Sequence, residues 1–284
     1  TMPELHDSDA MRWSEMAVFY RTNAQSRILE EAMMRTGVPY KVVGGTRFYD
    51  RKEIKDAIAY LRAVINPADE VSVKRVLNEP KRGIGDTTIG RLDAYAGAAG
   101  IAFSEALRRA EDAGVSGPAR RGIVKFLELL DELVQVQELG PGDLIQAALE
   151  RSGYLAELEA EQTVEAAGRL ENLGELVGSA REFETIDAFL EQVSLVADTD
   201  EIDDDDKVVL MTLHSAKGLE FPLVFLVGLE EGLFPNSRSA EEPGRMAEER
   251  RLAYVGITRA REQLVLAHAE CRRIHGSDLY GIPS

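Results

Sequence analysis

Residues 208–227 have the sequence Val208-Val-Leu-Met-Thr-Leu-His-Ser-Ala-Lys-Gly-Leu-Glu-Phe-Pro-Leu-Val-Phe-Leu-Val227. Two short apolar runs, at residues 208–213 and 223–227, enclose a connection that contains polar side chains and a glycine. Near-continuous apolar runs of this length are typical of strands that are buried on both faces of a parallel sheet. The stretch therefore predicts two buried strands joined by a polar connection.

Similar apolar runs lie near both ends of the chain, at residues 17–20, 38–43 and 263–267. Segments with helical spacing of apolar residues accompany them, at residues 24–36, 53–64 and 246–261. Strands that alternate with helices indicate an α/β fold with a mostly parallel sheet. We therefore expect the two ends of the chain to form one such domain.

The middle of the chain has a different pattern. From residue 67 to residue 206 the apolar spacing is helical, for example at residues 123–139, 143–149 and 186–196. The simplest organisation is an α/β domain of residues 1–66 and 207–284, interrupted by an all-helical insertion at residues 67–206. A chain of 284 residues is long enough for two domains of about 150 residues each.

The charge of the chain is distributed unevenly. There are 33 Lys and Arg against 50 Asp and Glu, a formal net charge of −17. Residues 72–125 hold ten basic and six acidic residues, whereas residues 126–206 hold three basic and 23 acidic residues. Because phosphate binding depends on local cations, the net charge does not exclude DNA, and it indicates which segment would bind it. Seven carboxylates within residues 198–206 predict a solvated linker rather than a metal site.

The composition also excludes several classes of protein. Hydrophobic residues make up 44% of the chain, which is too apolar for wholesale disorder. The single cysteine, Cys271, excludes an internal disulfide and a cysteine-rich zinc site. No run approaches the roughly 18 apolar residues of a membrane-spanning helix, and residues 1–12 do not resemble a signal peptide. We therefore expect a reducing, cytoplasmic setting.

Several catalytic motifs are absent from the sequence. No lysine follows a glycine, which excludes a G-x-x-x-x-G-K-[ST] phosphate loop. By itself the chain therefore cannot hold a triphosphate in the usual P-loop manner. The patterns H-E-x-x-H and G-x-S-x-G and the Cys/His spacing of zinc sites are missing as well.

Tyr20 and Arg21 lie where the first predicted strand ends. Parallel sheets bind ligands beyond the carboxyl ends of their strands. A tyrosine followed by an arginine at such an end can stack on a base and reach a phosphate. The alternative is a surface tyrosine beside an arginine that is paired with a carboxylate.

The connection between the strands at residues 208–213 and 223–227 contains His214, Gly218 and Glu220, directly after Thr212 and Leu213. Loops at strand ends contain functional residues more often than packing residues. Gly218 permits an unusual backbone angle. The alternative for His214 is a hydrogen-bonded structural histidine.

The predicted helix at residues 246–261 contains weak helix formers near its end. Residues 256–258, Gly-Ile-Thr, lower the helix propensity directly before Arg259. An arginine in such a place can stabilise the charge that develops on a γ-phosphate during its transfer. The alternative is a surface helix with i,i+4 charge pairs, which Glu248 and its charged neighbours fit.

The basic segment contains Pro80-Lys-Arg-Gly-Ile-Gly-Asp-Thr-Thr88. A Gly-x-Gly turn between helices exposes backbone N–H groups toward an anion. The residues that form or flank this turn are Lys81, Arg82, Gly83, Gly85, Thr87 and Thr88. The turn resembles a helix-hairpin-helix grip on duplex phosphates, which contacts the DNA backbone and not its sequence. The structural alternative is a tight helix–helix turn.

Several of these stretches together resemble one family. Y-R-T-N-A-Q-S-R, T-L-H-S-A-K-G-L-E-F and E-E-R-R-L-A-Y-V-G-I-T-R-A are similar, in this order, to motifs IV, V and VI of the UvrD/PcrA-type superfamily 1 DNA helicases. Residues 44–56, G-G-T-R-F-Y-D-R-K-E-I-K-D, resemble motif IVa, and the G-I-G turn resembles that of the 2B subdomain. The resemblance covers essentially the whole chain.

In that family two RecA-like domains, 1A and 2A, enclose ATP, and each has an insertion. The resemblance implies that this chain is a RecA-like 2A domain with its 2B insertion. It also implies that the phosphate-loop lysine and the Mg²⁺ ligands belong to an N-terminal 1A/1B half. ATP and Mg²⁺ are then cofactors of the full-length parent, and we expect this chain alone to hydrolyse no ATP.

The resemblance assigns roles to individual residues. Tyr20 would stack on adenine, and Glu220 would hydrogen-bond the ribose, with Gly218 in the same nucleotide-binding stretch. Arg21 and Arg259 would contact the γ-phosphate as catalytic residues, Arg259 as the arginine finger.

The resemblance also implies contacts with DNA. Thr212 and His214 would face single-stranded DNA, and the G-I-G turn would grip the duplex. The family usually has a large aromatic residue before Gly276, and His275 occupies that position here, where it can stack on a base less strongly.

The partners implied are a single-strand/duplex DNA junction, the N-terminal half of the helicase, and proteins of repair or transcription, with no membrane. The parent would be a bacterial, nucleoid-associated 3′–5′ helicase of repair or replication. Two alternatives stay open: a stand-alone module that binds DNA or protein without catalysis, and a subunit of a helicase–nuclease.

Overall fold

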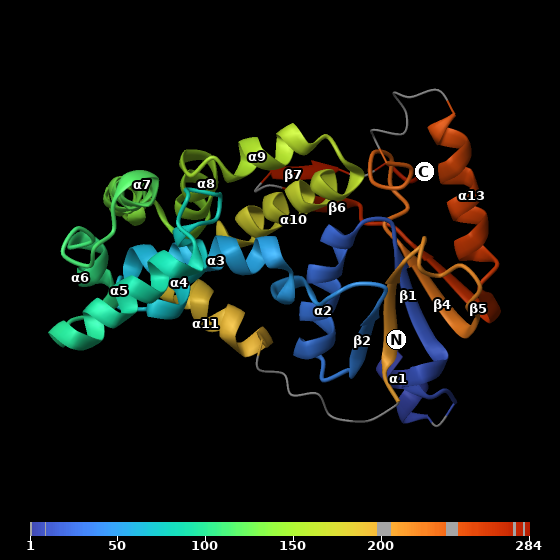
Figure 1. Ribbon diagram of the computed structural model, residues 1–284. Coiled ribbons are helices and arrows are strands. Elements are labelled where there is room, and N and C mark those ends of the chain that lie inside the picture. The colour runs from blue at the N-terminus through green and yellow to red at the C-terminus, as the bar shows by residue number, and fades with distance from the viewer. Residues whose placement is uncertain (1, 9, 198–205, 237–243, 275–276, 281) are drawn as a thin grey trace. The chain divides into compact units, whose positions relative to one another are not determined.

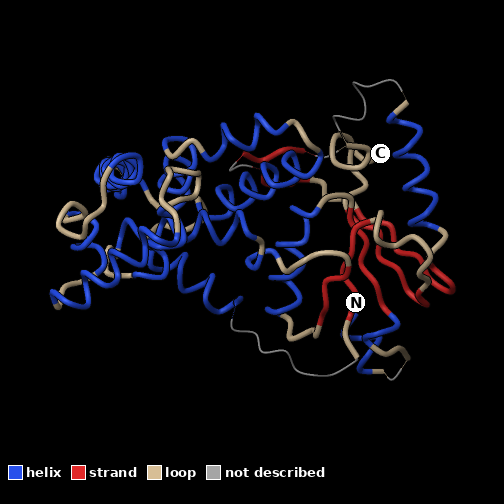
Figure 2. Tube along the Cα trace, viewed as in Figure 1, coloured by secondary structure: helices blue, strands red, loops and turns tan. Residues whose placement is uncertain are grey.

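The computed structural model describes residues 2–8, 10–197, 206–236, 244–274, 277–280 and 282–284 (Figures 1 and 2). The chain forms two compact units, residues 1–51 with 193–284, and residues 52–192. We call them the α/β unit and the helical unit.

A five-stranded parallel sheet forms the centre of the α/β unit, in the order β2-β3-β1-β4-β5. The strands are β1 (Met16–Tyr20), β2 (Tyr40–Val43), β3 (Val208–Thr212), β4 (Phe221–Val227) and β5 (Ala260–Ala267). Strands from both ends of the chain therefore share one sheet, which confirms the predicted α/β fold class. The order of the strands was not predictable from the apolar runs alone.

Alternate residues of β1 pack on opposite faces of the sheet, as the two-residue period of a strand requires. On one face, Ala17 and Phe19 pack in a cluster with Leu252 of α13 (Arg245–Ile257). On the other face, Met16, Val18 and Tyr20 pack in a cluster that includes Met33. Met33 belongs to α2 (Ser26–Arg35), which ends before Gly37, a glycine with φ of 69°.

Short elements complete the α/β unit. They are α1 (Met2–Asp7), the 3₁₀ turns η1 (Trp13–Glu15), η2 (Asn23–Gln25) and η3 (Phe48–Asp50), and a two-stranded antiparallel hairpin of β6 (Cys271–Ile274) and β7 (Ser277–Tyr280).

The helical unit is built around α3 (Lys52–Ile65), whose residues Ile54, Tyr60 and Leu61 are fully buried. The other elements are α4 (Glu70–Leu77), α5 (Asp86–Ala99), α6 (Phe103–Arg108), α7 (Gly117–Val134), η4 (Gln137–Leu139), α8 (Pro141–Arg151), α9 (Tyr154–Glu161) and α10 (Val164–Ala180). Helix α11 (Ile186–Ala197) spans the boundary to the α/β unit. The helical character predicted for this region is thus confirmed.

Three boundaries differ from the prediction. The compact helical unit ends at Gln192 rather than at residue 206. The compact helical unit begins at Lys52 rather than after residue 66, because α3 packs against α4, α7, α8 and α10 of the helical unit. Helix α13 ends at Ile257, and β5 begins at Ala260, so the predicted helix at residues 246–261 is too long. Arg259 therefore lies in the turn between α13 and β5. Residues 198–205 of the acidic run lie outside the described residues.

Candidate nucleotide and DNA site

The carboxyl edge of the sheet brings together the ends of β1 and β3. Tyr20 pairs with Thr212 in the parallel ladder, so Arg21 and His214 follow neighbouring strands at the same edge. The backbone of Arg21 is fixed locally, because the N–H groups of Arg21 and Thr22 both donate to Gln25 Oε1 at 2.9 Å. The chain thus holds Arg21 at a defined place beyond the strand.

The guanidinium of Arg21 is paired with Glu249 of α13. Its Nη2 donates to Glu249 Oε1 at 2.7 Å, and its Nε donates to Oε2 at 3.0 Å. The Glu249 side chain is 3% exposed, whereas that of Arg21 is 19% exposed. The pair therefore joins the end of β1 to the first turns of α13 and leaves part of the cation accessible.

His214 lies within the electrostatic reach of this pair. Burial lowers the pKa of His214, and the positive charge of Arg21 lowers it further, while Glu249 and Glu248 oppose the shift. The imidazole is therefore more often neutral than an ordinary histidine at the same pH. The structure thus brings Arg21 and His214, which were predicted to contact different ligands, into one electrostatic environment.

The turn after β3 is shaped by its own hydroxyl groups. Thr212 Oγ1 lies 3.1 Å from Ser215 Oγ, and the Ser215 N–H donates to the Thr212 carbonyl at 3.0 Å. Gly44, at the end of β2, packs against Ser215 and has φ of 80°. Thr212 thus has a structural contact in addition to its predicted contact with DNA.

A second group of predicted residues lies at the amino edge of the same sheet. Arg259 accepts a hydrogen bond at its carbonyl from Phe221 N–H, which fixes it beside the start of β4. Its guanidinium donates to the carbonyl of Leu219 at 3.3 Å and to that of Val255 at 3.2 Å. Glu220 is exposed and accepts from Arg261 Nε at 3.1 Å. Gly218 has φ of 87°, as its predicted role in the turn requires.

Arg21 and Arg259 are therefore not side by side. Arg21 follows the carboxyl end of β1, and Arg259 precedes the amino end of β5, in a sheet whose strands are parallel. The connection from Leu213 to Glu220 runs from one edge to the other. The structure assembles two groups of predicted residues, joined by this connection.

Tyr20 is buried in this structure, and its stacking on adenine stays a prediction. Its side chain is 1% exposed and packs in the cluster with Val18 and Met33, because Tyr20 points to the same face of β1 as Val18. Burial is the largest cause that raises the pKa of its hydroxyl, and the negative charge of Glu30 raises this pKa further. In this conformation Tyr20 offers no ring face to adenine, so the expected stacking requires the side chain to move.

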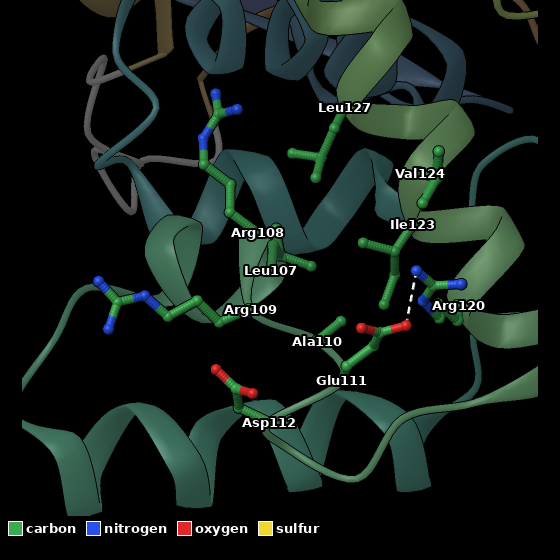
Figure 3. Close-up of a pocket in the computed structure, with 10 residues that line it drawn as sticks. All are labelled: Leu107, Arg108, Arg109, Ala110, Glu111, Asp112, Arg120, Ile123, Val124 and Leu127. Atoms are coloured by element: carbon green, nitrogen blue, oxygen red, sulfur yellow. Dashed lines mark ion pairs between the residues drawn. The ribbon is translucent and has the colours of Figure 1, made fainter.

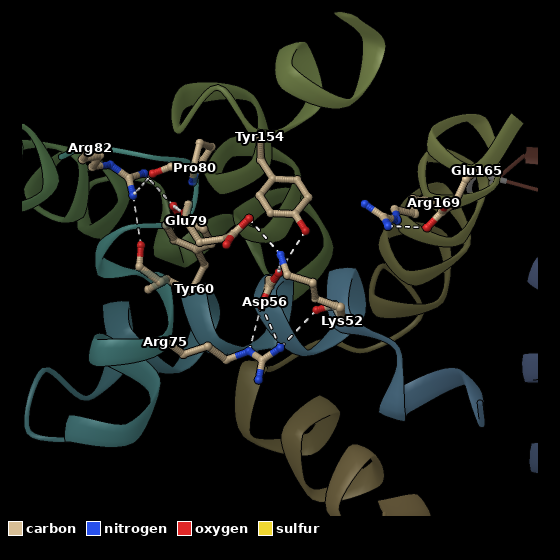
Figure 4. Close-up of polar contacts among 11 residues, drawn as sticks. Lys52, Asp56, Tyr60, Arg75, Glu79, Pro80, Arg82, Tyr154, Glu165 and Arg169 are labelled. Carbon is tan, nitrogen blue, oxygen red and sulfur yellow. Dashed lines mark hydrogen bonds and ion pairs between the residues drawn. The ribbon is translucent and has the colours of Figure 1, made fainter. Parts of the chain in front are cut away.

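Arg82, in the turn between α4 and α5, makes contacts within the chain that the sequence did not predict. Its Nη1 donates to the carbonyl of Val76 at 2.9 Å. Nη1 also donates to the carbonyl of Pro80 at 3.1 Å, and Nη2 donates to Tyr60 Oη at 2.7 Å (Figure 4). The guanidinium thus caps the carboxyl end of α4 and braces the turn, because the last carbonyls of a helix lack partners within it. In this structure the guanidinium of Arg82 is engaged within the chain, and its contact with a phosphate stays a prediction.

The rest of the turn is exposed. Lys81, Gly83, Gly85 and Thr87 are exposed, and Thr88 is half-buried. Gly85 is the N-cap of α5 and, as a glycine, has no side chain that could cap this helix end. The arrangement leaves Lys81 and the first residues of α5 exposed, as the helix-hairpin-helix prediction requires.

Most other cations of the predicted basic segment are paired internally. A hollow of about 210 Å³ between α6 and α7 is lined by Arg108, Arg109 and Arg120 (Figure 3). These arginines pair with Asp131, Glu105 and Glu111, respectively. The hollow is therefore not a free anion site, and the local excess of basic residues overstates the available positive charge.

Glu249, Ser215 and Tyr60 were not predicted as site residues. The partners of Glu249 and Tyr60 are distant in sequence, whereas Ser215 contacts Thr212 three residues away. His275 lies outside the described residues. Among the residues that the structure describes, no group of three His, Cys, Asp or Glu side chains is arranged to hold a metal ion. In the same part of the chain, no helix is both long and apolar enough to cross a bilayer.

Comparison with known proteins gives the family of the chain. The family model for the UvrD-like helicase C-terminal domain matches residues 3–114 and 123–270. The ATP-dependent DNA helicase PcrA of Bacillus subtilis is 45% identical over 287 residues, which cover 96% of this chain and 39% of the relative. The ATP-dependent DNA helicase UvrD1 of Mycobacterium tuberculosis H37Rv is 46% identical over 300 residues, which cover 97% and 39%, respectively. The chain thus spans about two fifths of the length of these relatives. It belongs to the UvrD-like helicase C-terminal domain family.

Proposed function

We propose that this chain is the C-terminal motor and DNA-binding portion of an ATP-dependent 3′–5′ DNA helicase of repair or replication. The α/β unit corresponds to domain 2A, and the helical unit corresponds to 2B. The proposal rests above all on the carboxyl edge of the sheet, where Arg21 and His214 share one electrostatic environment. A nucleotide contact and a DNA contact on adjacent strands are what a motor needs to couple the two ligands.

The residues present fit one side of a nucleotide site. Arg21 and Arg259 supply positive charge, and Glu220 supplies an exposed carboxylate for a ribose hydroxyl. We propose that ATP lies between this domain and a second domain, which provides the phosphate loop and the Mg²⁺ ligands. Mg²⁺ would neutralise charge that develops on the phosphates during transfer.

The contacts of Arg21 and Arg259 would couple ATP binding to closure of the two domains. In this structure Arg21 is held by Glu249, and Arg259 is held by backbone carbonyls. We propose that both gain contacts with the γ-phosphate only when the two domains close, in a movement that also brings their side chains together. A ligand that makes different contacts in two states shifts the balance between them, so hydrolysis of the γ-phosphate bond would allow the domains to open.

Replacement of Arg259 in the complete helicase tests this assignment. We expect Arg259→Ala to lower the DNA-stimulated turnover of ATP by about 10³-fold, because an arginine finger stabilises the transition-state charge. Arg251→Ala is the matched control, since Arg251 is on α13 and pairs with Glu248 at the surface. Near-normal ATP turnover in Arg259→Ala would contradict the assignment.

A second candidate function is a stand-alone module that binds DNA without catalysis. The exposed Lys81 turn of the helical unit favours it. Titration of this chain with a duplex that has a 3′ single-stranded tail, at a series of salt concentrations, tests it. Salt-dependent binding would show that the chain holds DNA by itself, whereas the absence of binding at low salt would contradict this candidate.

A further inference from the structure

The pair of Arg21 and Glu249 has an uneven geometry. Both carboxylate oxygens of Glu249 accept from one edge of the guanidinium, through Nε and Nη2. Nη1 of Arg21 has no hydrogen-bond partner among the residues that the structure describes. The carboxylate thus occupies one edge of the guanidinium and leaves the edge that contains Nη1 for another acceptor.

A guanidinium group can use its two edges for two different acceptors. It has five N–H donors in a planar fork, and a carboxylate or a phosphate oxygen pair uses only two of them at a time. An arginine can therefore be held by one anion while it binds a second one. A lysine cannot be oriented in the same way, because its ammonium is a point charge without distinct edges.

Glu249 is itself fixed in place. Its side chain is 3% exposed, and its Oε2 also accepts from the backbone N–H of Asn236 at 3.2 Å. A carboxylate that is buried and held by several donors has little freedom to follow a moving partner. Glu249 therefore sets the position of Arg21, and not the reverse.

We propose that Glu249 is a positioning residue for recognition of the γ-phosphate: it holds the Nε/Nη2 edge of Arg21 so that the Nη1 edge faces the nucleotide. The inference rests on the proposed function, in which Arg21 contacts that phosphate. Glu249 also belongs to α13, the helix that leads to Arg259. The same contact therefore fixes the start of the helix that precedes the second arginine.

The test uses Glu249→Gln in the complete helicase. Gln keeps the size of the side chain and one acceptor oxygen but removes the charge and the second acceptor. We expect kcat for ATP to fall about 10–100-fold, the scale of loss from a misplaced contact. We also expect weaker binding of a non-hydrolysable ATP analogue but unchanged binding of ADP, since ADP lacks the γ-phosphate. Glu248→Gln is the matched control, because Glu248 is adjacent on α13 but pairs at the surface with Arg251.

Two results with Glu249→Gln would overturn the inference. One is a kcat and an affinity for the ATP analogue that equal those of the unmodified enzyme. The other is an equal loss of affinity for ADP and for the analogue, which would indicate a general structural role. If this variant does not fold, Arg21→Lys replaces it: loss of turnover supports the division of the guanidinium, and retained turnover overturns it.

Arg21→Ala separates this inference from the proposed function. Normal ATP turnover in Arg21→Ala would contradict the proposed contact between Arg21 and the γ-phosphate. A defect in Arg21→Ala together with normal turnover in Glu249→Gln would leave the proposed function intact and remove only the role of Glu249.

Discussion

Gly44 lies so close to Ser215 that a methyl group at position 44 would overlap with Ser215 Oγ and stand 2.9 Å from its Cβ. Ser215 Oγ is in turn 3.1 Å from Thr212 Oγ1. The end of β2 therefore packs directly against the turn that presents His214. A side chain at position 44 would push this turn away from the sheet.

Gly44→Ala should destabilise the α/β unit and displace the turn. Its φ of 80° is unfavourable for residues with a Cβ by about 1–2 kcal/mol, and the contact with Ser215 adds to this. Gly45→Ala is the control, because a methyl group there would meet no atom within 4 Å. Urea unfolding measures the stability, and hydrogen exchange at residues 213–216 reports on the turn. Equal stability of the two variants would contradict the prediction.

Tyr154→Phe should destabilise the helical unit. Tyr154 Oη donates to Asp56 Oδ2 at 2.9 Å, and Asp56 is 2% exposed and also bonded to Arg75 Nε at 2.8 Å (Figure 4). Loss of a hydrogen bond to a buried charge costs about 1.5–3 kcal/mol. Tyr95→Phe is the control, since its contact with Asp112 is at the surface and 3.5 Å long. The measurement is the free energy of unfolding of each variant. Equal free energies of unfolding for Tyr154→Phe and Tyr95→Phe would contradict a stabilising role of the hydrogen bond from Tyr154 to Asp56.

The stability of the α/β unit should depend on Glu230 in a defined pH range. Glu230 is 4% exposed, and the hydrogen bonds from Arg272 at 2.8 and 3.0 Å are the main reason that its pKa is lowered from 4.5. A carboxyl whose pKa is lower in the folded state stabilises the fold above its unfolded pKa, and this contribution is lost as the pH falls through the folded pKa.

Glu230→Gln should therefore be less stable than the unmodified chain at neutral pH, and the gap should shrink below pH 4.5. Denaturant unfolding at a series of pH values measures it. Glu105→Gln is the control, because Glu105 pairs with Arg109 at the surface. A gap that stays constant down to about pH 3 would show that the charge of Glu230 is not the cause.

The sequence predicted the local structure well, but it did not predict which distant residues meet. The five strands were predicted from apolar runs, because a buried parallel strand has a local signature. No local pattern distinguishes Glu249, which is buried against Arg21, from Glu248, which pairs at the surface. The end of α13 was placed too late, because its charged pattern continues into Arg259 and Arg261, although the chain has already turned into β5.

Two basic residues that are adjacent in the sequence show the same limit. Both Lys81 and Arg82 were predicted to contact DNA, and nothing in the sequence distinguishes their roles. In the structure Lys81 is exposed, whereas Arg82 donates to carbonyls of the α4 end and to Tyr60. Their different roles follow from where the helix carbonyls lie, which is a tertiary property.

Replacement of these two residues should therefore affect different properties of the chain. Arg82→Ala should cost about 2–3 kcal/mol of stability, because a charged donor with several acceptors is lost. Lys81→Ala should change stability by less than about 0.5 kcal/mol, as is usual at an exposed site. It should instead weaken binding to a tailed duplex and reduce the slope of log affinity against log salt by about one, as the loss of one phosphate contact predicts.

Urea unfolding and a salt series of DNA titrations measure the two effects on the same preparations. Lys41→Ala, at an exposed position of β2, controls for the loss of one positive charge. If Lys81→Ala and Lys41→Ala bind the duplex equally well, the turn between α4 and α5 is not the duplex contact. If Arg82→Ala is as stable as Lys81→Ala, the cap on α4 contributes little, and the side chain of Arg82 is free to leave it for a phosphate.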